Sequence, residues 1–374
     1  MVLDWLRLQD FRNVSEAALR FNSRFNIIIG ENGQGKSNLL EAIALLATGR
    51  SFRKATPEAM RRHGQPQYRL AGSTRAMGLQ HRLEFSGDKN RQTARLNGKA
   101  MGVASALGQA LAAVVSTPDS PGLIPGGPSE RRDYLDWVVF SDDRQHAATV
   151  RDYNGALKAR NRLLKTGCRD QRQLAAWEDR LAVLGAIITM RRRRIIEKIV
   201  GELPPYLEAL ALDPERFKMR LSCQLDRFAE TNDPETLAER YRQMLEKSRS
   251  SDQRTGATSI GPHRDDIPFQ IDGRLLARFG SRGQKKRFIL ALKLTEAKLL
   301  EQSVGEPPLI LLDDPVAELD REGVERLIAL LARQQQQVFL TACNAGELPR
   351  LEEPSSSFVV AEGLFKTLTE QTDS

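Results

Sequence analysis

Residues 25–41 of the 374-residue chain read FNIIIGENGQGKSNLLE and contain its clearest motif. The run Ile27–Ile29 is β-branched without polar alternation, which is typical of a strand buried on both faces of a parallel sheet. It ends at Gly30, and the residues from Gly30 to Ser37 fit G-x-x-x-x-G-K-[ST] without a mismatch. Apolar residues at helical spacing follow Ser37. A strand, a glycine-rich loop and a helix in this order predict a loop (the P-loop) that binds the phosphates of a nucleoside triphosphate.

Each position of this loop has a role in the predicted site. Glycines let the backbone approach the phosphates closely, so that several N–H groups can point inward together. Lys36 would reach the β- and γ-phosphates, and the Ser37 hydroxyl would hold Mg²⁺ at the N-terminus of the helix. The residues expected to bind the nucleotide are Gly30, Glu31, Asn32, Gly33, Gln34, Gly35, Lys36 and Ser37. A glycine-rich surface turn is the alternative, but the flanking strand and helix argue against it.

The composition is that of an ordinary globular protein, with 40% hydrophobic and 28% charged residues in a chain long enough for two or more domains. No apolar run approaches the ~20 residues of a membrane-spanning helix, and the start, MVLDWLRLQDF, does not look like a signal peptide. Cys168, Cys223 and Cys343 fit no zinc spacing, which favours reduced thiols in a cytoplasm. The net charge of +8 favours a polyanionic partner.

The hydrophobic periodicity divides the chain into three parts. Short strands fill much of residues 1–116, whereas from Ser129 the period changes from two to 3.6. Within residues 171–200 the apolar positions follow a spacing like that of a coiled coil. Strand periodicity returns at Thr255 and alternates with helices. We therefore expect an α/β head made of residues 1–116 and 255–374, with a mixed sheet and helices, split by a mostly helical arm of residues 117–254.

Two carboxylates follow the apolar run Leu309–Leu312. At the carboxyl end of a parallel strand, Asp313 would hold Mg²⁺ through water, opposite Ser37. Asp314 would orient or activate the attacking water as a general base, or would support the site without touching that water. An apolar strand that ends in Asp-Asp is weak evidence alone, because many strands end in an acidic turn. Together with the P-loop it predicts the metal site.

The segment SRGQ at Ser281–Gln284 precedes a strongly amphipathic stretch. A serine hydroxyl, a glycine N–H and a helix N-terminus form a second anion site, so we expect Ser281, Gly283 and Gln284 to bind the nucleotide. The alternative is a helix N-cap without a ligand. Its position shortly before the Asp313 strand favours the anion site.

Together these motifs resemble the ABC-type ATPase heads of the SMC family and, more narrowly, the RecF family of bacterial recombination mediators in DNA replication and repair. The resemblance runs from end to end and rests on FRN (11–13), GENGQGKSNLLEAI (30–43), GRSFR (49–53), RRDYLD (131–136), GPHRDD (261–266), GQKKRFILALKL (283–294) and LLDDPVAELD (311–320). Three places depart from common patterns. Ser120-Pro121 replaces an acidic residue and a leucine that are frequent in the family, and Arg282 replaces a frequent Gln. Thr341 stands where transporter ATPases have His, and this threonine agrees with RecF.

The resemblance implies a split ABC-type head and a mechanism. In such proteins the P-loop of one head holds ATP and Mg²⁺ while the signature serine of a second head closes over the γ-phosphate. ATP would therefore join a homodimer, and a weak DNA-dependent ATPase activity would release it as a slow switch. Asp320 would lie at the subunit seam. The resemblance also implies binding to single-stranded, gapped or junction DNA, RecO and RecR as partners in RecA loading, and a part in the SOS response.

Two basic segments are candidates for the DNA contact. Residues 151–200 hold thirteen Lys/Arg against five Asp/Glu, including the run Arg191–Arg194, and phosphate attraction needs such a surface. A solvated helix face explains this excess equally well. The competing set lies beside the P-loop helix and consists of Arg50, Arg53, Lys54, Arg61 and Arg62. His263 lies in a motif of the family and is expected to be structural.

Three other functions compete with this interpretation. A transporter motor subunit predicts a switch histidine, and Thr341 stands at that position. A structural SMC-like protein that bridges DNA needs a longer arm, because ~30 helical residues span only about 45 Å. A small-molecule kinase would not need Ser281–Gln284.

Overall fold

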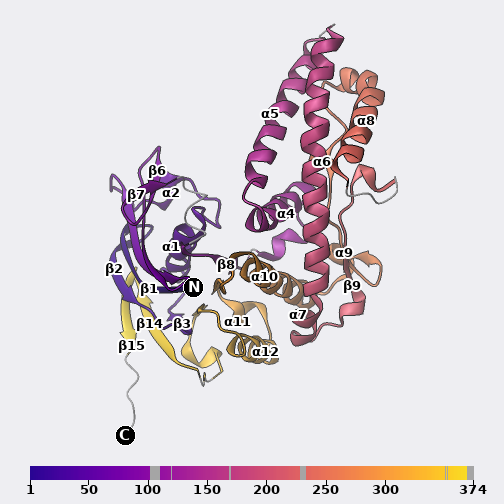
Figure 1. Ribbon diagram of the computed structural model, residues 1–374. Helices are drawn as coiled ribbons and strands as arrows, with labels where there is room; N and C mark the ends of the chain where they lie inside the picture. Colours follow the sequence, from indigo (N-terminus) through magenta and orange to yellow (C-terminus); the bar gives the residue numbers. More distant parts are fainter. Residues whose placement is uncertain are drawn as a thin grey trace. The chain divides into compact units, whose positions relative to one another are not determined.

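The computed structural model describes residues 1–101, 110–118, 120–167, 170–227, 233–349, 351 and 353–368, which form two compact units (Figure 1). The head unit comprises Met1–Pro121, Pro205–Leu212 and Arg282–Ser374, and the helical unit comprises Gly122–Pro204 and Asp213–Ser281. In the sequence, the helical unit thus lies mostly between the first and the last segment of the head unit. Residues 255–281 are part of the helical unit, where Phe269–Ile271 pairs with Phe217–Met219.

The first sheet of the head unit has the strand order β15-β14-β3-β13-β12-β8. Its strands are β3 (Phe25–Ile29), β8 (Ala113–Ser116), β12 (Leu309–Leu312), β13 (Val338–Ala342), β14 (Ser355–Ala361) and β15 (Leu364–Leu368). All pairs are parallel except β14 with β15. Every residue of β12 and β13 is buried, as expected for parallel strands covered on both faces. The strand before the P-loop and the strand before Asp313 thus flank β13.

The second sheet of the head unit is antiparallel and has the order β2-β1-β4-β5-β6-β7. Its strands are β1 (Val2–Phe11), β2 (Val14–Arg20), β4 (Tyr68–Ala76), β5 (Leu79–Gly87), β6 (Gln92–Leu96) and β7 (Lys99–Met101). Strand β15 also contacts β2, so the two sheets meet at this point (Figure 1).

Helix α1 (Lys36–Thr48) lies between the two sheets. It contacts β1, β4 and β5 of one sheet and β8 and β13 of the other. Ten of its 13 residues are therefore buried, which explains why the stretch after Ser37 is apolar nearly all round. The other helices of the head unit are α2 (Pro57–Met60), α10 (Arg282–Val304), α11 (Pro315–Glu318) and α12 (Arg321–Ala332).

The helical unit is built on α6 (Gln171–Glu202), which packs against α4 (Pro128–Asp142), α5 (His146–Lys165) and α8 (Pro234–Thr255). Leu174, Leu181, Ile188 and Ile195 recur every seven residues along α6 and are at most 2% exposed, so the predicted apolar seam is confirmed. The unit also holds the three-stranded sheet β11-β10-β9, with β9 (Phe217–Met219), β10 (Phe269–Ile271) and β11 (Arg274–Leu275), followed by α9 (Leu276–Phe279). The short helix α7 (Pro204–Ala209) follows α6 after Leu203, and its residues from Pro205 onward belong to the head unit.

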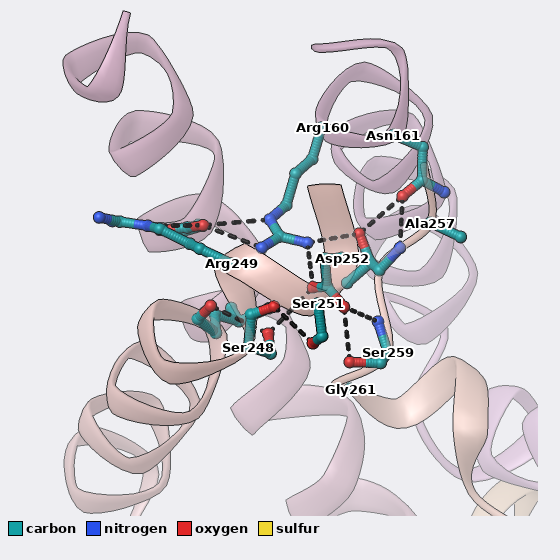
Figure 2. A network of polar contacts seen from close by, with 12 residues as sticks. Arg160, Asn161, Ser248, Arg249, Ser251, Asp252, Ala257, Ser259 and Gly261 are labelled. Atoms are coloured by element: carbon teal, nitrogen blue, oxygen red, sulfur yellow. Dashed lines mark hydrogen bonds and ion pairs between the residues drawn. The ribbon is translucent and has the colours of Figure 1, made fainter. Parts of the chain in front are cut away.

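A buried charged network joins three parts of the helical unit. Arg160 of α5 is fully buried and donates to Asp252 of α8 at 2.8 Å and to Glu178 of α6 at 2.9 Å (Figure 2). Asp252 in turn accepts hydrogen bonds from the backbone and hydroxyl of Ser259 in the loop after α8. Arg249 of α8 also pairs with Glu178, at 2.5 Å, so two guanidiniums balance the two buried carboxylates and fix the register of α5 against α6 and α8.

Cys223 and Cys343 are free thiols, and Cys168 lies outside the described residues. Among the helices that the structure describes, none combines the length and the apolar character needed to cross a membrane.

Candidate functional site

The two predicted metal ligands lie next to each other in the head unit. The carboxyl ends of parallel strands share one sheet edge, so the P-loop after β3 and Asp313 after β12 meet there. The Ser37 hydroxyl donates to Asp313 Oδ1 at 2.8 Å. Thr341 at the end of the intervening strand β13 also donates to Asp313 Oδ1, at 2.9 Å, and its hydroxyl accepts from the backbone N–H of Asp314 at 2.8 Å. Thr341 therefore orients both acidic residues.

This arrangement fits a magnesium ion. Mg²⁺ prefers oxygen ligands, and the Ser37 hydroxyl and the Asp313 carboxylate lie side by side at this sheet edge. Ser37 would hold the ion directly and Asp313 would hold it through water. Within the described residues no group of three or more His, Cys, Asp or Glu side chains could hold a metal. A P-loop magnesium does not need such a group, because nucleotide oxygens and water complete its coordination.

The P-loop presents its backbone N–H groups as an anion site would require. Those of Gly33, Gly35, Lys36 and Ser37 have no hydrogen-bond acceptor among the described residues. The last two belong to the first turn of α1, where a helix leaves its N–H groups unpaired. Gly35 has φ = 123°, a conformation that other residues rarely adopt. Lys36 is 5% exposed, and its ammonium donates to the carbonyls of Gly30 and Glu31 at the mouth of the loop.

Two turns from distant parts of the sequence hold the P-loop through Gln34. The Gln34 carbonyl accepts from Asn13 Nδ2 at 3.0 Å and from the Gly363 N–H at 2.9 Å. Its side-chain oxygen accepts from the Glu362 N–H at 2.5 Å. Asn13 also accepts from Asn38 in the first turn of α1, at 2.8 Å. The predicted nucleotide-binding residue Gln34 is thus fixed from both sides. No local sequence pattern pointed to the contribution of Glu362 and Gly363, because 328 residues separate Glu362 from Gln34.

The basic candidates beside the P-loop helix are largely engaged within the head unit. The buried carboxylate of Glu41 accepts two hydrogen bonds from Arg12, at 2.7 and 2.9 Å, and Arg53 lies 3.5 Å from it. Arg61 lies 3.8 Å from Glu58, and Arg62 lies 3.7 Å from Asp10. Since Arg53, Arg61 and Arg62 each have an acidic neighbour, this set offers less unpaired positive charge than its sequence suggests.

Asp314 has a structural role in this conformation. It adopts a left-handed backbone conformation, with φ = 49°, and its carboxylate accepts from the Ala317 N–H at 3.3 Å as the N-cap of α11. Asp314 directly follows Asp313 in the chain, so its backbone lies at the same edge of the sheet. Its assignment as the general base stays a prediction.

The segment Ser281–Gln284, which we call the signature segment, lies where the chain passes from the helical unit to the head unit. Ser281, Arg282 and Gly283 are exposed, and α10 begins at Arg282. Further along α10, Arg287 pairs with Asp320 at 2.8 Å, and Lys286 donates to the carbonyl of Ala317 at 3.0 Å. Asp320 caps α12, and the Gly323 N–H together with Arg287 lowers its pKa. The signature helix is therefore tied to the segment that follows Asp313 within the same head.

The run Arg191–Arg194 does not form one exposed basic face, contrary to the expectation for a DNA surface. Arg192 is 4% exposed and pairs with Asp136 and Asp265, at 2.8 and 2.9 Å. Arg191 lies 2.8 Å from Asp143, and Arg193 lies 3.6 Å from Asp226. Successive residues of a helix point in directions about 100° apart, so a continuous run necessarily turns some of its members inward. Only Arg194 of the four is exposed.

His263 has structural partners, as expected. Its Nε2 lies 3.0 Å from the carbonyl of Thr258, which can only accept, so Nε2 carries the proton. Nδ1 then accepts from the hydroxyl of Tyr153 at 2.7 Å. Burial lowers the pKa of His263 to about 4. The imidazole is therefore neutral at physiological pH and links α5 to the loop after α8.

Comparison with known proteins agrees with this site. The model of the family described as "RecF/RecN/SMC N terminal domain" matches residues 2–365. The protein from Magnetococcus marinus described as "DNA replication and repair protein RecF" is 50% identical, over 99% of this chain and 98% of its own length. The protein of the same description from Geotalea uraniireducens is 35% identical, over 97% of this chain and 99% of its own length.

Solved structures give the same result for the fold. The structure described as the recombination mediator protein RecF with ATP, in the RecFOR pathway, superposes with a TM-score of 0.88 at 29% identity and covers 98% of both chains. The Smc head domain of Pyrococcus furiosus, bound to the C-terminal domain of ScpA, has a TM-score of 0.55 at 17% identity. It covers 98% of this chain and 96% of the Smc chain, and at this identity it supports the fold alone.

Proposed function

Since the chain belongs to the RecF family of SMC-type ATPase heads, we propose that it is an ATP-dependent DNA-binding protein of DNA replication and recombinational repair. The proposal rests mainly on one observation, the contact between Ser37 and Asp313 beside the unpaired N–H groups of the P-loop. This is the arrangement that a nucleoside triphosphate with Mg²⁺ needs. The description of the ATP-bound relative supports ATP as that nucleotide.

The P-loop N–H groups and Lys36 would bind the phosphates, while Ser37 and Asp313 would hold Mg²⁺, which polarises the phosphates when bound. Asp314 would position the attacking water and take up its proton. Ser281 is exposed, and by the family resemblance it would close over the γ-phosphate of a nucleotide held by a second copy. Each site would then be complete only in a dimer, which couples dimerisation to ATP binding. Hydrolysis would be slow and would release the two copies.

The finer parts of the proposal concern DNA and partners. Binding to single-stranded, gapped or junction DNA would be followed by RecA loading together with RecO and RecR, with consequences for the SOS response. The description of the ATP-bound relative, which names the RecFOR pathway, supports these partners. A cytoplasmic location follows from this function, because the bacterial chromosome lies there.

The experiment that tests the proposed function is retention of gapped DNA by the wild-type chain and by Lys36→Met, with ATP, with ADP and without nucleotide. We expect ATP-dependent retention for the wild type and its loss in the variant, because Met cannot donate to phosphate oxygens. Lys89→Met is the matched control, since Lys89 is exposed and lies outside both the P-loop and the two candidate DNA segments. Normal ATP-dependent retention by Lys36→Met would contradict the phosphate assignment.

A further inference from the structure

Helix α5 of the helical unit has two sharply different faces. Tyr153, Ala156, Arg160 and Leu164 are spaced by three or four residues and are all at most 4% exposed. They form the inner face, which packs on α6 and α8. The opposite face carries four exposed basic residues, which we call the α5 basic stripe: Arg151, Lys158, Arg162 and Lys165.

The spacing of the stripe makes it straight and narrow. Its members follow one another after seven, four and three residues. At 100° per residue these positions fall within an arc of about 60°, and the 14 steps from Arg151 to Lys165 span about 21 Å. Four positive charges thus lie in one row along one helix, unlike the run Arg191–Arg194, which winds around its helix.

The positive charge of the stripe is not neutralised within the described parts of the chain, where none of its members makes an ion pair. The single acidic residue of α5, Asp152, points out of the stripe toward α6, where it lies 3.5 Å from Arg180. The buried arginines of this unit have carboxylate partners, as shown by Arg160 and Arg192. Exposed cations in a row without acidic neighbours are the electrostatic footprint of a polyanion site.

The helix that carries the stripe is held rigidly. Arg160 is anchored between Glu178 and Asp252 on the inner face (Figure 2). Asn161, next to Arg160, accepts from the backbone and the hydroxyl of Thr258, at 2.8 and 2.7 Å. A helix that is already fixed loses little conformational entropy when its side chains bind a ligand. The arrangement therefore favours a ligand that presents its own charges in a regular row.

We infer that the α5 basic stripe binds the phosphate backbone of double-stranded DNA. This inference rests on the proposed function and deepens it by placing the duplex on α5. A duplex presents phosphates on a stiff helix, which suits a straight row of about 21 Å. Single-strand sites instead combine basic grooves with aromatic side chains that stack on bases. Tyr153, the one aromatic residue of α5, is 2% exposed and faces inward, so the stripe offers phosphate contacts without base contacts.

The test compares two variants that each lose four positive charges, at different places in the helical unit. In the stripe variant, R151Q, K158Q, R162Q and K165Q are combined, and Gln keeps the helix because its helix propensity is close to that of Lys and Arg. In the control variant, K218Q, R220Q, K247Q and R254Q remove exposed cations elsewhere in the helical unit. Binding to a 30-base-pair duplex and to a single strand of equal length is measured by fluorescence anisotropy, with ATP, at 50 to 250 mM salt. Thermal unfolding of both variants checks that the helical unit is intact.

We expect the stripe variant to bind the duplex at least about tenfold more weakly than the wild type, with a salt slope lower by about 3 to 4, since each phosphate contact adds roughly one to the slope. The control variant should stay within about threefold. Equal losses in the two variants would overturn the inference, because the effect would then follow net charge. An equal loss of single-strand and duplex binding would overturn the assignment to the duplex. A wild-type chain that binds neither DNA would contradict the proposed function itself.

Discussion

The hydroxyl of Ser37 and the carboxylate of Asp313 are joined by a hydrogen bond of 2.8 Å, although 276 residues separate them in the sequence. The parallel strands β3, β13 and β12 bring the two residues to one edge of the sheet. A helical unit is inserted between the two halves of this site without separating them. The proposed nucleotide site therefore depends on contacts across the whole head unit, and residues that orient Ser37 and Asp313 should affect it as strongly as the proposed ligands do.

Thr341 tests this dependence. Its buried hydroxyl donates to Asp313 and accepts from the Asp314 N–H, so Thr341→Val leaves that N–H without its acceptor. We expect a loss of about 1–3 kcal/mol in the free energy of unfolding and a lower rate of ATP hydrolysis. Thr341→Ser loses a methyl group but keeps the hydroxyl, so it is the control and should keep wild-type hydrolysis. Chemical denaturation and single-turnover hydrolysis measure the two effects. A valine variant with wild-type hydrolysis would show that Thr341 does not orient the acidic pair.

The turn at Glu362–Gly363 provides a second prediction. Gly363 has φ = 78°, and a Cβ there would lie 2.5 Å from the carbonyl oxygen of Asn13. Gly363→Ala should displace the turn and release Gln34, weakening ATP binding by about 1–2 kcal/mol, or about tenfold. Isothermal titration with a non-hydrolysable ATP analogue measures the affinity. The control is Gly346→Ala, because a Cβ at Gly346 meets nothing within 4 Å. Unchanged affinity in Gly363→Ala would mean that the P-loop keeps its shape without this turn.

His263 predicts a dependence of stability on pH. Its pKa is about 4 in the folded chain and about 6.5 when unfolded, so the unfolded state binds more protons between these values. The contribution of His263 to the free energy of unfolding is fully present above pH 6.5. It is lost as the pH falls toward 4, by up to about 3 kcal/mol. Gln carries one donor and one acceptor, so His263→Gln should be less sensitive to acid between pH 7.5 and 5.

The measurement for His263 is the difference between wild type and variant, because other groups titrate in the same unit. Burial raises the pKa of Asp265 to about 7, which has the opposite sign: its contribution to stability falls as the pH rises toward 7. Urea unfolding at several pH values, with His63→Gln as the control, isolates the imidazole. The prediction fails if His263→Gln and wild type lose equal stability in acid.

The sequence was most informative for features that depend on short patterns of neighbouring residues. The strand, P-loop and helix around Lys36 and the strand that ends at Asp313 follow from short patterns of residue type, and the structure places them as expected. The apolar seam of α6 was equally readable, because a seven-residue period is a local property.

Features that depend on distant contacts could not be predicted in this way. The hydrogen bonds that hold Gln34 come from Asn13 and Gly363, which no local pattern connects. The run Arg191–Arg194 looked like a basic surface, but its acidic partners Asp136, Asp226 and others come from separate segments. The extent of the helical unit to Ser281 depends on a distant contact too, because β10 pairs with β9, about 50 residues earlier in the chain.

The central claim is that ATP joins two copies of the chain through Ser281. The most direct measurement is sedimentation of the wild type and of Ser281→Arg with ATP, with ADP and without nucleotide. Ser250→Arg, a change at another exposed serine of the helical unit, is the control. We expect a dimer only with ATP for the wild type and for Ser250→Arg, and a monomer under all conditions for Ser281→Arg. An ATP-dependent dimer that survives in Ser281→Arg, or a wild-type chain that stays monomeric with ATP, would contradict the composite site.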